Sequence, residues 1–69
     1  MINYEPFWRT IKDKKVSTYA LREKHGISSE TLHRLRHNKP VTTTTLNDLC
    51  GILDCGVSDI IRYERDDPV

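Results

Sequence analysis

Residues 17–37 read STYALREKHGISSETLHRLRH, and this stretch decides the fold. Ser17 is a good helix N-cap, and it predicts a helix over residues 18–25. Gly26 then predicts a left-handed stop, because glycine adopts a positive φ angle without steric cost. Ser28 caps another helix, which reaches the end of the stretch at about residue 37. The two helices are separated by a short connection that contains a glycine, which is typical of a helix-turn-helix.

Apolar residues on both sides of this stretch recur at spacings of three and four, the pattern of an amphipathic helix. They form two sets: Tyr4, Phe7, Trp8 and Ile11 before the stretch, and Leu46, Leu49, Cys50 and Leu53 after it. Thr42 or Thr43 is the predicted cap of the later helix, and Ser58 that of a short fifth helix with Ile60 and Ile61. No strand pattern is visible. We therefore predict an all-α, compact five-helix domain.

The chain has 69 residues, enough for one small domain, which we place at residues 1–69 with a frayed tail at 64–69. A domain of this size has a thin core and little room for a catalytic pocket, so we do not expect an enzyme. No apolar run approaches the roughly 18 residues of a membrane span, and the first residues lack the pattern of a secretory signal. We expect a cytoplasmic protein with no membrane partner.

The net charge of +1 conceals an uneven distribution of charge along the chain. Residues 9–39 contain nine basic and three acidic side chains, a net charge of +6. Residues 40–69 contain two basic and six acidic side chains, a net charge of −4. The basic first half indicates a surface for an anionic partner such as nucleic acid, and the acidic second half a surface that avoids it. Two merely solvated faces would give the same distribution.

The helix after Ser28 has one face that can pack and one that is entirely polar, at about 100° per residue. The polar stripe consists of Ser29, Glu30, His33, Arg34 and His37. It has no lysine–glutamate pair at a spacing of four, the usual decoration of a solvated helix. Arginine can bind guanine and glutamate can accept from cytosine, so the stripe favours contact with DNA. A solvated surface helix is the alternative.

Five fragments, taken in order, resemble the phage lambda repressor and Cro family of helix-turn-helix transcription regulators. They are residues 17–21 (STYAL), 26–28 (GIS), 31–35 (TLHRL), 45–46 (TL) and 53–61 (LDCGVSDII). The likeness covers about residues 7–63 and is greatest to the short branch found in phages, mobile elements and Gram-positive chromosomes. It implies a five-helix domain whose third helix enters the major groove of duplex DNA.

The resemblance also implies roles for the residues that match the family's motif. Base contacts fall on Ser29, Glu30 and Arg34. Phosphate contacts fall on Thr18, Ser28, Asn38 and Lys39, to which we add His33 from the polar stripe. The packing positions are Leu21, Ile27, Leu32 and Leu35, and Gly26 matches the turn glycine.

Two positions depart from the family's pattern. Arg22 stands where a small residue is usual at the crossing of the two helices, and its aliphatic stem can lie along the crossing. His25 stands where an apolar residue is common. We expect it to be a partly buried histidine with a hydrogen-bond partner.

We expect no metal site, no cofactor and no small-molecule ligand. His33 and His37 are four residues apart, but no complete zinc-binding spacing accompanies them. Cys50 and Cys55 are expected to be reduced thiols, the first in the core and the second partly exposed. No nucleophile pairs with a base, because the serines at 17, 28 and 58 are explained as helix caps.

The sequence therefore predicts sequence-specific binding of double-stranded DNA by a small transcription regulator, which we expect to be a repressor. A protein-interaction module with the same fold, such as an antitoxin or an anti-repressor, is the alternative. One short helix-turn-helix reads few base pairs, so we expect a weak homodimer on a palindromic operator. The predicted dimer interface is Ile52, Ile61 and Tyr63, apolar residues at the acidic end that could instead complete the monomer core.

Overall fold

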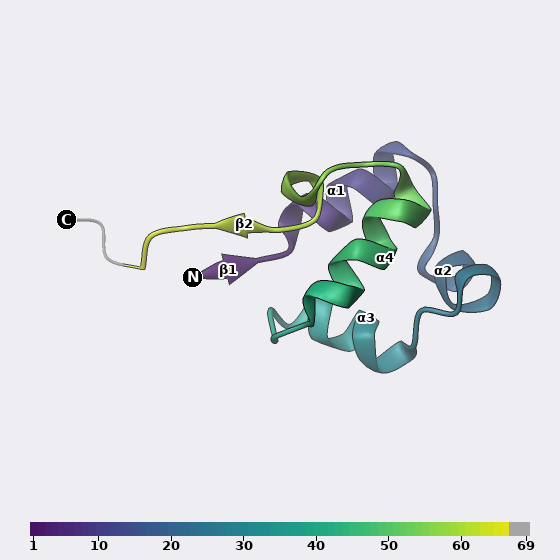
Figure 1. Cartoon of the computed structure of the whole chain (residues 1–69), viewed down its shortest axis with the longest axis horizontal. Coiled ribbons are helices and arrows are strands. Elements are labelled where there is room, and N and C mark those ends of the chain that lie inside the picture. Colours follow the sequence, from purple (N-terminus) through teal and green to yellow (C-terminus); the bar gives the residue numbers. More distant parts are fainter. Residues whose placement is uncertain (67–69) are drawn as a thin grey trace.

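The computed structural model describes residues 1–66, which form four α-helices and a short antiparallel β-ribbon around one core. The helices are α1 (Glu5–Asp13), α2 (Thr18–His25), α3 (Ser29–Arg36) and α4 (Thr43–Leu53), followed by the 3₁₀ turn η1 (Val57–Asp59). The ribbon consists of β1 (Ile2–Asn3) and β2 (Arg62–Tyr63). Figure 1 shows the ribbon extending away from the packed helices.

Side-chain caps set the starts of three helices, as the sequence indicates. The hydroxyl of Ser17 accepts from the amide of Ala20 at 3.0 Å, and that of Ser28 accepts from the amide of Thr31 at 3.1 Å. Gly26 ends α2 with a φ angle of 72°, in the left-handed region that favours glycine. The predicted bounds of α2 are confirmed. Thr42, and not Thr43, caps α4.

The predicted fifth helix is wrong. Ser58 does not cap a helix, because the amide of Gly56 donates to the carboxylate of Asp59 at 3.0 Å and closes the three-residue turn η1. The chain then becomes extended as β2. The prediction of no strands is therefore wrong as well: Tyr63 pairs with Ile2, and Arg62 with Asn3.

The first three residues of the predicted frayed tail lie beside the N-terminus of the chain. The amide of Glu64 donates to the carbonyl of Met1 at 2.8 Å, and the ammonium of Met1 lies 3.0 Å from a carboxylate oxygen of Asp66. Residues 64–66 therefore continue along the first residues of the chain. Residues 67–69 of the predicted tail lie outside the described residues.

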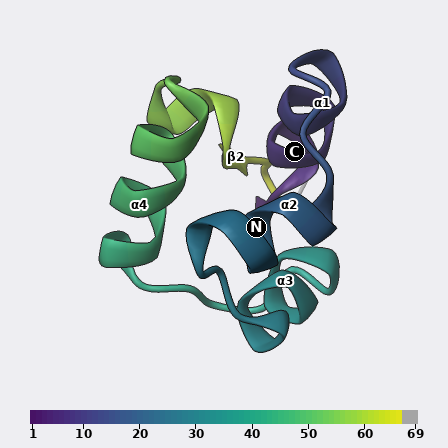
Figure 2. The ribbon, with the colours of Figure 1, turned by 90° about the vertical axis from the view of Figure 1, so that its right-hand side faces the viewer.

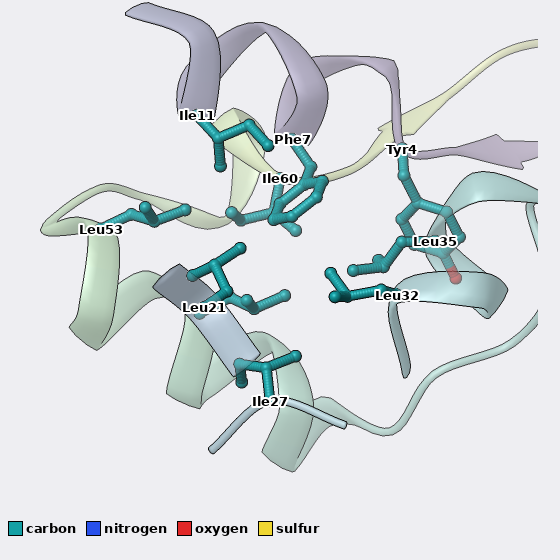
Figure 3. Packing of buried hydrophobic residues seen from close by; sticks show 10 residues of the cluster. Tyr4, Phe7, Ile11, Leu21, Ile27, Leu32, Leu35, Leu53 and Ile60 are labelled. Carbon is teal, nitrogen blue, oxygen red and sulfur yellow. The ribbon is translucent and has the colours of Figure 1, made fainter. Parts of the chain in front are cut away.

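One hydrophobic core joins all four helices to the segment after η1. Its ten buried residues are Tyr4, Phe7, Ile11, Leu21, Ile27, Leu32, Leu35, Leu49, Leu53 and Ile60. Figure 3 shows Phe7 beside Ile60, with the residues of α2 and α3 below them. The amide of Phe7 also donates to the carbonyl of Ile60 at 3.2 Å, so the last part of the chain closes over the first helix. The four predicted packing positions of the helix-turn-helix are all buried.

Within residues 1–66, no helix combines the length and the apolar character that a crossing of a bilayer requires.

Candidate nucleic-acid interface

Helix α3 divides into a buried side and an exposed polar side. Leu32 and Leu35 are buried, with only 5% and 1% of their surfaces exposed, and they anchor the helix on the core. Ser29, Glu30, His33, Arg34 and His37 are all exposed. The predicted polar stripe is thus a continuous surface with no apolar side chain in it, carried by a helix whose other side is anchored.

A tryptophan of α1 holds α3 in place. The indole Nε1 of Trp8 donates to the carbonyl of Leu35 at 3.4 Å, and the guanidinium of Arg36 lies 5.0 Å from the centre of the Trp8 ring. The Trp8 ring meets that of Phe7 edge-on, with centroids 4.8 Å apart. Such contacts restrict α3 to one orientation. Figure 2 shows α2 and α3 next to each other at one end of the molecule, with α1 and α4 on either side.

The polar stripe contains an ion pair that the sequence analysis missed. A guanidinium nitrogen of Arg34 lies 2.8 Å from a carboxylate oxygen of Glu30, and both side chains are largely exposed. The spacing of four between Glu30 and Arg34 is the sequence signal for such a pair, with arginine in place of lysine. One turn along, the rings of His33 and His37 lie 4.3 Å apart. Glu30 therefore restricts the position of the exposed Arg34 guanidinium.

The N-termini of α2 and α3 are each capped by one serine hydroxyl. The hydroxyl of Ser28 both accepts from the Thr31 amide and donates to the Thr31 hydroxyl at 3.0 Å. At α2, the hydroxyl of Ser17 accepts from the amide of Ala20, and the amides of Thr18 and Tyr19 have no partner within the helix, at the positive end of its dipole. Thr18 itself is half-buried. This end of α2 has the chemistry of a phosphate site.

The loop after α3 is tied to the start of the chain. Asn38 has a φ angle of 54°, and its side-chain oxygen accepts from the amide of Tyr4 at 3.3 Å. The Tyr4 hydroxyl donates to the carbonyl of Lys39 at 2.7 Å, and the Lys39 amide donates to the carbonyl of Arg34 at 2.8 Å. These bonds fix the backbone from which the exposed Lys39 side chain extends.

Besides Arg34, two of the nine basic residues at positions 9–39 lie close to carboxylates in the folded chain. Lys14 lines a hollow with Asp54 and Asp59, at the acidic end of the molecule, and Arg9 is paired with Glu5 at 3.0 Å. Both cations therefore have carboxylates nearby that offset part of their positive charge.

His25, at the turn between α2 and α3, is not the partly buried histidine that the sequence predicts. Its side chain is exposed, and the predicted burial is wrong. The reason is the direction of the chain at Gly26, where the left-handed turn sends Ile27, and not the preceding histidine, into the core. Arg22 is also exposed.

Comparison with known proteins agrees with this geometry. A model of the Cro/C1-type HTH DNA-binding domain matches residues 7–66. The chain belongs to this family. The Cro/C1-type domain is also similar to a solved structure of the transcriptional regulator VanUg, with a TM-score of 0.84 and 31% sequence identity over 94% of this chain and 87% of that one. No curated protein matches the chain.

The cysteines of this Cro/C1-type domain lie away from α3. Cys50 and Cys55 are half-buried, and the amide of Cys55 donates to the carbonyl of Cys50 at 3.1 Å. Burial, together with the neighbouring Cys50, raises the pKa of the Cys55 thiol, so the neutral form dominates near pH 7. Within residues 1–66, no group of three or more potential metal ligands is found.

The three residues of the expected dimer interface are not brought together. Ile52 is half-buried and lines a hollow with His25 and Ile27, at the turn between α2 and α3. Ile61 and Tyr63 lie in and beside the β-ribbon and line a different hollow. A single contact between two copies would therefore use either Ile52 or the ribbon.

Proposed function

We propose that the Cro/C1-type domain is a transcriptional repressor that binds a palindromic operator as a weak homodimer. In this proposal α3 enters the major groove, where Ser29, Glu30 and Arg34 contact base edges. The phosphate contacts come from Thr18, Ser28, His33, Asn38 and Lys39. The observation that carries the proposal is the unbroken polar face of a helix whose other face is anchored in the core.

Whether a group suits a phosphate or a base follows from how the structure holds that group. Lys39 extends from a backbone fixed by Tyr4, and the uncapped amides at the start of α2 are neutral donors. Both suit phosphates, which have the same position on every sequence. Arg34 projects from the second turn of α3, and its partner Glu30 limits its rotamers. A pre-positioned guanidinium suits the two acceptors of a guanine.

The test is a gel-shift titration with the DNA upstream of the protein's own gene at several salt concentrations, with a scrambled duplex as control. We expect preferred binding of the upstream DNA that weakens steeply with salt, with a logarithmic slope of roughly −0.9 per phosphate contacted. Affinity that does not depend on salt would contradict the proposal. A protein-interaction module would instead bind a protein partner and shift neither duplex.

A further inference from the structure

The end of α4 brings Cys50 and Cys55 to the same side of the helix. Asp54, the residue that follows the helix, has a φ angle of 51°, in the left-handed region. The amides of Asp54 and Cys55 both donate to the carbonyl of Cys50, the second of them at 3.1 Å. In this type of helix ending, the side chain after the left-handed residue packs against the side chain five residues earlier. Here those two side chains are the two cysteines.

The same hydrogen bond limits the distance between the backbones of the two cysteines. Its N and O atoms are 3.1 Å apart, so standard bond lengths place the two Cα atoms at most about 7 Å from each other. A disulfide requires Cα atoms closer than about 7 Å and side chains that converge. Burial raises the pKa of the Cys55 thiol, and a side-chain hydrogen bond with Cys50 raises it further, so the two side chains are in contact. The reduced pair therefore meets both requirements.

Cys55 is the cysteine that a small reagent can reach. Both cysteines are half-buried and pack against the core. Cys55 also lines a hollow of about 210 Å³ with Thr10, Lys14 and Asp59, and Cys50 is not among the residues that line it. Within this hollow the ammonium of Lys14 favours the thiolate form of Cys55, which is the nucleophilic form. The hollow thus gives a small disulfide a route to the sulfur of Cys55.

We propose that Cys50 and Cys55 are a site of reversible oxidation, at which the two thiols become an intrachain disulfide. The oxidant is a small disulfide, RSSR. The Cys55 thiolate attacks one sulfur of RSSR and releases RS⁻, which leaves a mixed disulfide on Cys55. The Cys50 thiolate then attacks the Cys55 sulfur, forms the bond between the cysteines and releases the second RS⁻. The two cysteine protons leave on two molecules of RSH, so both cysteines are oxidised and one RSSR is reduced.

This disulfide would tighten the connection between α4 and η1, and it is independent of the proposed function. Ile60, directly after η1, is fully buried, and its carbonyl accepts from the amide of Phe7 at 3.2 Å. A bond across residues 50–55 restricts the unfolded chain just before this closing segment, so oxidation should stabilise the fold. Figure 1 shows that α4 begins beside α3 and ends away from it. Oxidation at the end of α4 should therefore leave the polar side of α3 unchanged.

The test compares the folded chain with the same chain in urea. The reduced protein is equilibrated with 2-hydroxyethyl disulfide and 2-mercaptoethanol at several ratios, quenched with acid and weighed by mass spectrometry. We expect a monomer two hydrogen atoms lighter than the reduced chain, which dithiothreitol converts back. Since the chain has two cysteines, this product carries the proposed bond. Its equilibrium constant should be about tenfold higher or more in buffer than in urea, because the fold holds the thiols together. An equal or lower constant in the folded chain overturns the proposal.

A shifted cysteine is the matched control for closeness along the chain. The double variant Cys55→Ala/Gly56→Cys keeps two cysteines but moves one out of the contact at the helix end. A Cβ at residue 56 would lie 3.9 Å from a carboxylate oxygen of Asp59, an ordinary contact, so we expect this variant to fold. Its equilibrium constant should be alike in buffer and in urea. A preference for the folded state equal to that of the wild type would contradict the role of the helix ending.

Single variants test the order of the two steps. In Cys50→Ala no second thiol can displace the reagent, so we expect a mixed disulfide to accumulate on Cys55, heavier by one mercaptoethanol group. In Cys55→Ala the remaining thiol, Cys50, does not line the hollow and should react more slowly. Circular dichroism checks that both variants are folded. Equal rates, or a faster reaction of Cys55→Ala, would overturn the assignment of Cys55 as the attacking residue.

Discussion

At the scale of single residues, Arg34 is the side chain from which we expect most of the base preference. We expect Arg34→Ala to cost about 1–3 kcal/mol on the cognate operator and to relax the preference at one base pair. Arg34→Lys keeps the charge but lacks the two-pronged donor, so it should recover non-specific affinity and not the base preference. Binding-site selection with the three proteins measures both effects. An unchanged preference with weaker binding would mean that Arg34 contacts phosphate alone.

In the proposed complex, Glu30 would repel the phosphates of the DNA while it positions Arg34. Glu30→Ala removes a negative charge from α3 and frees the Arg34 guanidinium that Glu30 holds at 2.8 Å. We therefore expect tighter binding to random duplex and a smaller ratio of specific to non-specific affinity. Parallel titrations of operator and scrambled DNA give that ratio. A ratio at or above the wild-type value would contradict the role of Glu30.

The elements of the helix-turn-helix depend on backbone geometry at their ends. Gly26→Ala puts a Cβ into open space, but at a φ angle of 72° it should lower the free energy of unfolding by about 1–2 kcal/mol. Gly51→Ala is the matched control: its Cβ also meets nothing, yet residue 51 lies inside α4, so the substitution should stabilise by about 0.5–1 kcal/mol. Urea denaturation measures both, and the same sign for the two variants would refute this account.

These local rules explain which elements the sequence could predict. The caps at Ser17 and Ser28 and the stop at Gly26 act within a few residues, so α2 and α3 could be predicted from the sequence. The pairing of Tyr63 with Ile2 joins residues about sixty positions apart, and no local spacing encodes it. Ser58 does not cap a helix, because the carboxylate of Asp59 accepts from the amide of Gly56 and closes a shorter turn.

In the candidate site, too, the local features could be predicted from the sequence and the long-range ones could not. The polar stripe follows from helical spacing alone, and the structure exposes all its members. The tie between Tyr4 and the loop after α3 was not predictable, since it spans more than thirty residues. The distribution of charge beside α3 also depends on tertiary structure, which places Lys14 with Asp54 and Asp59.

On the scale of the whole molecule, Tyr4 connects the start of the chain to the loop after α3. Tyr4→Phe keeps the buried ring and removes only the hydroxyl bonded to the Lys39 carbonyl at 2.7 Å. We expect a loss of about 0.5–1.5 kcal/mol in the free energy of unfolding. Binding to all duplexes should also weaken, because Lys39 loses its fixed backbone. Lys39→Ala, measured by gel shift, should weaken all sequences alike; a change in base preference in either variant would contradict this.

The contact of Phe7 with Ile60 and the pairing of β1 with β2 have a consequence for how the protein is made. The ribosome releases the N-terminus first, so the ring of Phe7 and the first strand emerge long before their partners do. The helix-turn-helix at residues 17–37 has its local contacts early, but the core that anchors α3 closes only when residues 60–63 have left the exit tunnel. Until then the nascent chain exposes apolar side chains to chaperones. A chain that lacks residues 60–63 would therefore lack the anchored α3 on which the proposed DNA contact depends.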